Sequence, residues 1–142
     1  MKINFTKKQY KQLLDLVYLG EWTANSAKEE DERHIGYEEL FQYICSFAKD
    51  FGSEDFVVSD KAMARYFLTR EYEEQLEPII QENDNEVFWN ELAGRLARRD
   101  LARTQNVFAS EGDATAKYFE TAGNYEIEFE NNGLENLELR KP

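Results

Sequence analysis

The sequence predicts an all-α fold in which residues 1–142 form a single domain, a bundle of five or six helices. Apolar residues recur at intervals of three and four along several segments, which is the period of an α-helix. Hydrophobic residues make up 42% of the chain and aromatic residues 14%, which is enough for a buried core. The connections between the periodic segments are short, and a chain of 142 residues is most simply one domain.

The first predicted helix covers about residues 7–24 and has a well-defined start. Thr6 and Gln9 match the capping box, in which each side chain binds the backbone N–H of the other residue. Lys7 and Lys8 stand in the first turn, where the helix dipole favours negative charge. We therefore expect acids from another segment, or from a second subunit, to lie near these two lysines.

The middle of the chain predicts several shorter helices. After a polar connection over 25–36, a helix is expected over about 37–51, ended by Gly52. Residues 53–60 are compatible with a strand. A short helix, capped by Ser59 or Asp60, is then expected to run through Met63 and Phe67.

Two further helices are predicted before residue 108. Thr69 can cap the first of them, and Pro78 is expected to kink or restart it because proline lacks an N–H group. Asp84 or Asn85 can cap the next helix, which would run to about residue 108.

The segment over residues 118–139 fits two patterns. The stretch YEIEF at 125–129 alternates apolar and acidic residues and is followed by Asn-Asn-Gly, which is typical of a β-hairpin. The same segment carries apolar residues at helical spacing, and glutamate tolerates a helix better than a strand. We predict a helix, with a short C-terminal hairpin as the alternative. The residues at helical spacing are Tyr118, Ala122, Tyr125 and Phe129.

The charge and composition restrict the classes of partner and the location. The formal net charge is −12, and an acidic surface disfavours direct binding to nucleic acid or to an anionic membrane. No apolar run approaches the roughly 18 residues that a membrane span needs, and the first residues do not resemble a signal peptide. The single cysteine, Cys45, cannot form an internal disulfide. We expect a cytoplasmic protein that needs no cofactor.

The helix containing FWNELAGRLARRDL, residues 88–101, gathers arginines in this acidic chain. Arg99, Asp100 and Arg103 continue its apolar stripe, and Arg95 lies at the border of that stripe. These side chains are either partly buried and paired with carboxylates, or exposed beyond the core, or part of an anion site. We predict the paired arrangement, with Arg99 buried against a carboxylate outside its own turn and Arg98 exposed.

Catalytic and metal-binding motifs are sparse. The only histidine, His34, lies in a charged connection without a nucleophile motif, and there is no glycine-rich phosphate loop. A divalent cation would have to use the acids near His34 or the Glu-x-x-Glu pair further along the chain. The candidate ligands are Glu29, Glu32, His34, Glu71 and Glu74.

These observations favour a protein-interaction or regulatory module over an enzyme. The partner would be another protein, and a homo-oligomer is included in this prediction. One alternative is an acidic mimic of nucleic acid that inhibits a basic nucleic-acid-binding enzyme, based on the charge of −12. A second alternative is a metal-dependent hydrolase that uses the acidic pairs.

Overall fold

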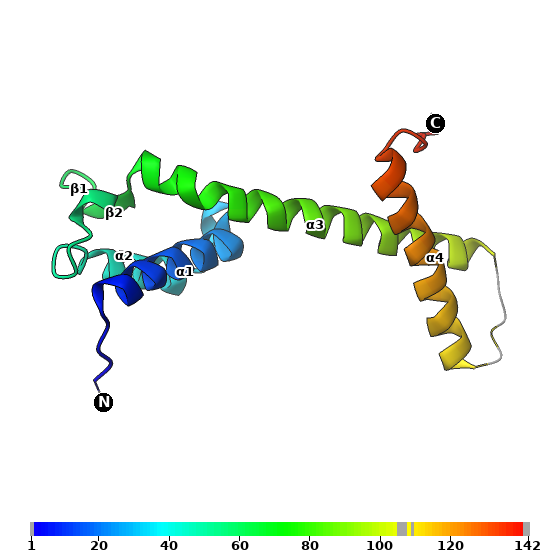
Figure 1. Ribbon diagram of the computed structural model, residues 1–142, viewed down its shortest axis with the longest axis horizontal. Helices are drawn as coiled ribbons and strands as arrows, with labels where there is room; N and C mark the ends of the chain where they lie inside the picture. The colour runs from blue at the N-terminus through cyan, green and yellow to red at the C-terminus, as the bar shows by residue number, and fades with distance from the viewer. Residues whose placement is uncertain (1, 105–107, 109, 141–142) are drawn as a thin grey trace. The chain divides into compact units, whose positions relative to one another are not determined.

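The computed structural model of the protein describes residues 2–104, 108 and 110–140, which form a mostly helical structure (Figure 1). The described residues contain four α-helices, so the predicted helical character is confirmed but the predicted number of helices is not matched. They also contain a two-stranded antiparallel hairpin and two single-turn 3₁₀ helices. The elements in chain order are α1 (Lys7–Asn25), η1 (Glu30–Glu32), α2 (Ile35–Cys45), η2 (Glu54–Phe56), β1 (Val57–Asp60), β2 (Arg65–Leu68), α3 (Arg70–Arg103) and α4 (Glu111–Asn132).

The chain forms two compact units, residues 1–80 and residues 81–142. The first unit contains α1, α2, the hairpin and the start of α3. The second unit contains the rest of α3 and α4. The expectation of one domain over residues 1–142 stays a prediction.

The capping box at the start of α1 is confirmed. The Thr6 hydroxyl accepts a hydrogen bond from the Gln9 N–H at 3.2 Å, and the Thr6 N–H donates to the Gln9 side chain at 2.9 Å. Both Lys7 and Lys8 are exposed, and neither forms an ion pair within the described residues. The expectation of acids from a second subunit near them stays a prediction. The first turn of α1 therefore carries two positive charges and no acid, which the helix dipole disfavours.

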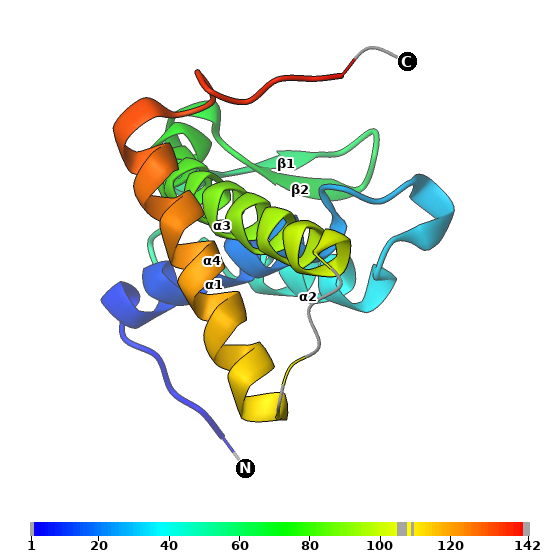
Figure 2. The same ribbon diagram turned by 90° about the vertical axis from the view of Figure 1, so that its right-hand side faces the viewer.

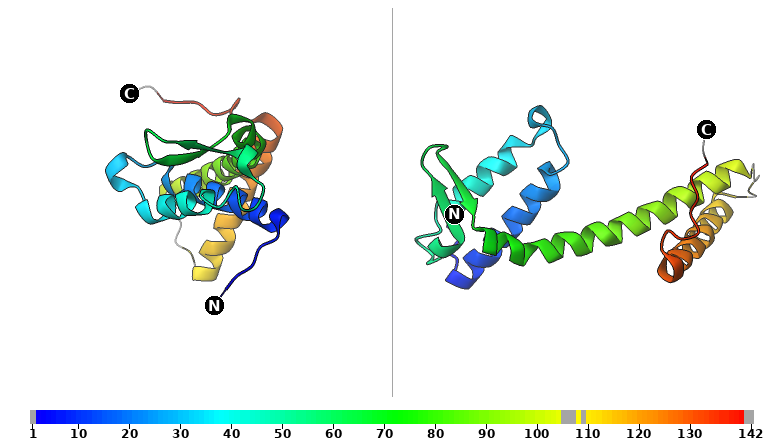
Figure 3. Two further views of the ribbon diagram at one scale, coloured as in Figure 1. Left: turned by 90° about the vertical axis from the view of Figure 1, so that its left-hand side faces the viewer. Right: turned by 90° about the horizontal axis from the view of Figure 1, so that it is seen from above.

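The α2 helix lies beside α1, and residues 26–34 connect the two (Figure 3, right). It ends at Cys45, six residues before the predicted end, because the chain continues in tighter turns whose hydrogen bonds span three residues. The predicted helix stop at Gly52 is therefore wrong, since α2 has ended before it. Gly52 lies at the end of these turns with a positive φ of 63°, a conformation that glycine adopts without strain.

The short helix predicted through Met63 and Phe67 is wrong, because this segment is a hairpin. Val57 pairs with Leu68 and Asp60 with Arg65. The Asp60 carboxylate accepts hydrogen bonds from the N–H groups of Ala62 and Met63, so it closes the turn of a hairpin instead of capping a helix. The predicted strand over 53–60 is confirmed for its last four residues.

The α3 helix is continuous over 34 residues, so the predicted restart at Pro78 and the predicted cap at Asp84 or Asn85 are wrong. Pro78 lies inside the helix, which loses one backbone hydrogen bond there and continues. The helix ends at Arg103; residues 105–107, which precede the predicted end, lie outside the described part of the chain.

The core of the first unit packs α1, α2, the hairpin and the start of α3 together. Tyr10 stacks on Phe51 with ring centroids 4.4 Å apart, and its hydroxyl donates to the Ile44 carbonyl at 2.6 Å. The Tyr72 hydroxyl donates to the Asp15 carboxylate, which gives the buried phenol a partner. The buried side chains at the centre are Leu14, Cys45, Leu68, Tyr72 and Leu76.

In the second unit α4 crosses the later part of α3 (Figure 2). The predicted helix over the C-terminal segment is confirmed, and Gly133 follows it with a positive φ of 57°. Three alanines of these helices, Ala93, Ala97 and Ala122, are buried. Trp89 packs against the buried Phe129 with ring centroids 5.4 Å apart.

Candidate functional site

Arg99 is not buried, so the arrangement predicted for it is wrong. Its side chain is 44% exposed, and its carboxylate partner is the adjacent Asp100, 2.8 Å away. The partner from outside its own turn is the hydroxyl of Tyr125 on α4, which accepts a hydrogen bond from Arg99 at 3.2 Å. A pair of helices has no third element to cover this face, so the charged groups reach water.

Asp100 is the centre of this small exposed cluster. The Tyr125 hydroxyl donates to the Asp100 carboxylate, and this hydrogen bond, with the Arg99 guanidinium, holds the pKa of Asp100 below its ordinary value. The same bond raises the pKa of Tyr125. The cluster therefore joins α3 to α4 by exposed polar contacts.

The other arginines of α3 also lie at the surface. Arg95 forms an exposed pair with Glu91 one turn earlier, at 3.2 Å, and Arg103 is exposed. Arg98 is exposed, as predicted, with its guanidinium 5.4 Å from the centre of the Tyr118 ring. The structure therefore does not bring these arginines together as a buried polar site, and whether they contact a partner stays untested.

The residues proposed as metal ligands do not converge. Among the residues that the structure describes, no three side chains of histidine, cysteine, aspartate or glutamate lie close enough to hold one ion. Glu74 pairs instead with Arg70 at 2.8 Å. All five candidate ligands are exposed: Glu29, Glu32, His34, Glu71 and Glu74. Cys45 is buried, and burial raises the pKa of its thiol to about 12, which makes it a poor nucleophile.

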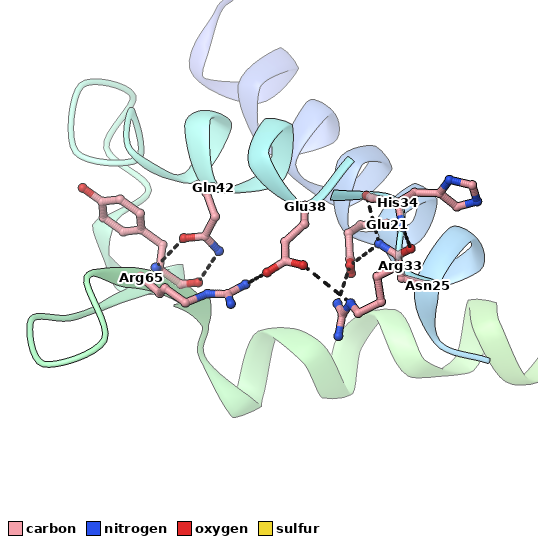
Figure 4. A network of polar contacts seen from close by, with 8 residues as sticks. Glu21, Asn25, Arg33, His34, Glu38, Gln42 and Arg65 are labelled. Carbon is pink, nitrogen blue, oxygen red and sulfur yellow. Dashed lines mark hydrogen bonds and ion pairs between the residues drawn. The ribbon is translucent and has the colours of Figure 1, made fainter. Parts of the chain in front are cut away.

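A network of charged side chains, which we call the polar network, joins the connection 26–34 to α1, α2 and β2 (Figure 4). Arg33 lies 3.0 Å from Glu21 on α1 and 3.5 Å from Glu38 on α2. The other oxygen of Glu38 accepts a hydrogen bond from Arg65 on β2. Both glutamates are mostly shielded from water, so these pairs are screened less than ordinary surface pairs.

Asn25 extends the polar network at the end of α1. Its side chain is 3% exposed; it accepts a hydrogen bond from the His34 N–H at 2.7 Å and donates to Glu21 at 2.9 Å. His34 is the residue that precedes α2, so Asn25 ties the last turn of α1 to the first turn of α2. The amide of Asn25 therefore fixes the connection between these two helices (Figure 4).

Gln42 completes the polar network on the hairpin side. Its side-chain amide accepts from the Tyr66 N–H at 2.7 Å and donates to the Tyr66 carbonyl at 2.9 Å. It thus satisfies both backbone groups at the free edge of β2, as a neighbouring strand would do.

Part of the polar network leaves a signal in the sequence, although its residues were not among the predicted site residues. The buried stripe of α1 passes through Tyr10 and Leu14 and continues, at helical spacing, into Glu21 and Asn25. Polar residues on an apolar stripe indicate buried hydrogen bonds, which is the pattern that predicted a buried Arg99. The pattern indicates burial correctly at α1, where a second helix and the connection cover the side chains, and wrongly at α3.

An apolar groove, which we call the α1/α2 groove, lies between these helices on their outer side and has a volume of about 590 Å³. Leu16 is 66% exposed and Leu40 is 48% exposed. Beyond its chain neighbours and the backbone of its own helix, no atom lies within 4 Å of the position that a Cβ atom would take at Gly20, so the groove is open at this residue. The lining residues are Leu16, Val17, Leu19, Gly20, Glu21, Thr23, Ala24, Tyr37 and Leu40.

The two ends of the α1 helix, which forms one wall of the groove, differ in charge. The connection 26–34 joins the end of α1 to the start of α2 and contains four consecutive exposed acids, residues 29–32. At the opposite end, α1 starts with the exposed Lys7 and Lys8. A ligand that lies along the groove therefore has negative charge beside the end that the connection forms, and only a ligand that extends along α1 beyond Leu16 approaches the lysines.

Comparison of the chain with protein-family models, curated proteins and solved structures gave no match. None of the helices in the described part of the chain combines the length and apolar character that crossing a lipid bilayer requires.

Proposed function

We propose that this protein is a protein-interaction module and that the α1/α2 groove is its binding surface. The observation that carries the proposal is the gathering of large exposed apolar side chains, Leu16, Tyr37 and Leu40, along one groove. Scattered apolar residues are ordinary on a protein surface, but a continuous apolar patch marks an interaction site. Fully burying one exposed leucine side chain contributes about 1.5–3 kcal/mol, so this patch supplies a driving force for binding.

The chemistry of the α1/α2 groove defines the partner. An apolar groove between two helices fits the apolar face of an amphipathic helix from a protein partner. The acids over residues 29–32 favour basic residues at the end of the partner that lies beside them. The occupant we propose is therefore a helix with an apolar face and a basic end.

The polar network supports this function because it holds the walls of the groove before the partner arrives. Glu21 belongs both to the groove lining and to the polar network. A surface that is already rigid loses less conformational entropy on binding, and more of the contact energy remains as affinity.

The alternatives from the sequence have less support. The proposed metal-dependent hydrolase needs carboxylates that converge, and the described residues do not place three such groups together. The acidic mimic of nucleic acid stays a prediction based on the net charge of −12.

A peptide titration tests the proposed function. The probe is a synthetic amphipathic helix with leucines on one face and lysines at one end, added to the ¹⁵N-labelled full chain. We expect amide shifts along the groove, around Leu16, Gly20 and Leu40, and weaker binding when glutamates replace the lysines. Leu40→Lys should abolish binding. Phe119→Lys, which also changes an exposed apolar side chain but on α4, is the matched control.

Shifts on other surfaces, or equal binding to wild type and Leu40→Lys, would contradict the proposal. Both variants change exposed side chains, so circular dichroism should show that the fold is kept.

A further inference from the structure

We infer that the occupant of the α1/α2 groove is a second copy of this chain, with the two α1 helices antiparallel across a two-fold axis near Leu16 and Gly20. This inference rests on the proposed function, because it names the partner of the same groove. A two-fold contact is made by the same surface on both copies, so that surface must be complementary to itself.

The apolar middle of α1 is complementary to itself in shape. Leu16 projects into solvent, and Gly20, one turn later, leaves open space beside the backbone. When two helices run antiparallel, Leu16 of each copy comes opposite Gly20 of the other. A leucine side chain then fills the space that the missing Cβ leaves, and the helices can approach closely.

The ends of α1 are complementary in charge. Rotation about the two-fold axis places the start of one α1 beside the end of the other. A helix rises about 1.5 Å per residue, so Lys8 lies about 15 Å from the middle of the contact and Asn25 about 10 Å on the other side. Glu29 follows four residues after Asn25. The lysines of one copy therefore lie within reach of residues 28–32 of the other, where four acids outnumber the single Lys28.

This pairing also gives Lys7 and Lys8 the negative partners that their own chain does not provide within the described residues. Uncompensated positive charge in the first turn destabilises a helix, and acids from the second copy would remove this cost.

The α4 helix provides the contrast that favours α1. It exposes Phe119 and Ile127 with the open Gly123 between them, so its apolar pattern is similar. The ends of α4 are not complementary in charge, however, because its first turn holds Glu111 and Asp113 and its last turn holds no basic residue. An antiparallel pair of α4 helices therefore gains no attraction between its ends, which an α1 pair does gain.

Sedimentation equilibrium of the full chain tests the inference. We expect the wild type to dimerise, and we expect Leu16→Glu to raise the dissociation constant by at least about tenfold, because two apolar contacts are lost per dimer. Gly20→Gln should also weaken the dimer by closing the open space. The same variant should make the monomer more stable, because glutamine favours a helix more than glycine does and no atom lies near the new side chain.

Gly123→Ala is the matched control. It also replaces a helical glycine that has open space around it, and it should leave the dissociation constant unchanged. A charge exchange adds a second test. Lys8→Glu and Glu29→Lys should each raise the dissociation constant by about three- to tenfold, and the double variant should recover most of the loss.

The outcomes separate the inference from the proposed function. A wild type that stays monomeric overturns self-association, and the peptide titration then decides whether the groove binds a different protein. A dimer that tolerates both Leu16→Glu and Gly20→Gln overturns the assignment of its interface to the groove. The inference is supported if Leu16→Glu raises the dissociation constant of the dimer, Gly123→Ala leaves it unchanged, and the double charge-exchange variant restores most of the affinity.

Discussion

Replacing Asn25 by alanine tests the role of the polar network most sharply. The side chain is 3% exposed and makes two strong hydrogen bonds, with the His34 N–H at 2.7 Å and with Glu21 at 2.9 Å. A third contact, with the His34 carbonyl at 3.4 Å, is long and contributes little. Each lost hydrogen bond costs about 0.5–1.5 kcal/mol, and a donor left without a partner costs more. We expect Asn25→Ala to lower the free energy of unfolding by about 2–3 kcal/mol.

The two tryptophans allow this loss to be assigned to the first unit. Trp22 lies in that unit and Trp89 in the second. In a Trp89→Phe background, urea unfolding followed by tryptophan fluorescence reports Trp22 alone. Ser26→Ala, at the exposed neighbouring position, is the control and should change the free energy of unfolding by less than about 0.5 kcal/mol. If Asn25→Ala costs no more than this control, Asn25 does not hold α1 and α2 together.

Further predictions concern the start of α1, the buried titratable groups and α3. Thr6→Ala should destabilise the protein by about 1 kcal/mol through loss of the capping box, and a neutral result in urea unfolding would contradict that role. Burial raises the pKa of Cys45 and of Tyr10 to about 12, from ordinary values of 9.0 and 10.0. The folded state therefore keeps these protons, and the stability they contribute is complete below about pH 9 and is lost as the pH rises towards about 12. Urea unfolding at increasing pH should show this loss of stability, and the loss should be smaller in Cys45→Ala. If the pH dependence is the same in that variant, the Cys45 thiol does not contribute to it. Arg99→Ala and Arg98→Ala should each cost less than about 1 kcal/mol because both side chains are exposed, and a much larger cost at Arg99 would show that it is buried after all.

Short sequence patterns correctly predicted the helices that are determined by residues close together in the chain. The capping box of Thr6 and Gln9 marked the start of α1, and the glutamates among the apolar residues of the C-terminal segment favoured the helix that became α4. The hairpin was missed because its turn has no glycine or asparagine. Ala64 adopts a positive φ of 50° there, and Asp60, which resembles a helix cap in the sequence, closes the turn.

The candidate site was harder to predict because it depends on which helix covers which face. The same pattern, a polar residue on an apolar stripe, occurs at Asn25 and at Arg99. At Asn25 the chain turns back and α2 covers the side chain, whereas at Arg99 only α4 is near and the side chain reaches water. Periodicity identifies a face of a helix but not the element packed against it, so the polar network and the α1/α2 groove needed the structure.

A concentration series of the ¹⁵N-labelled wild-type chain is the most direct test of pairing through the α1/α2 groove, because each amide reports whether its surroundings change as the protein associates. We predict shifts that grow with protein concentration along the groove, around Leu16, Gly20 and Leu40, and at residues 29–32. Spectra that do not change with concentration, or changes confined to α4 around Phe119 and Ile127, would contradict the claim that the groove pairs with a second copy.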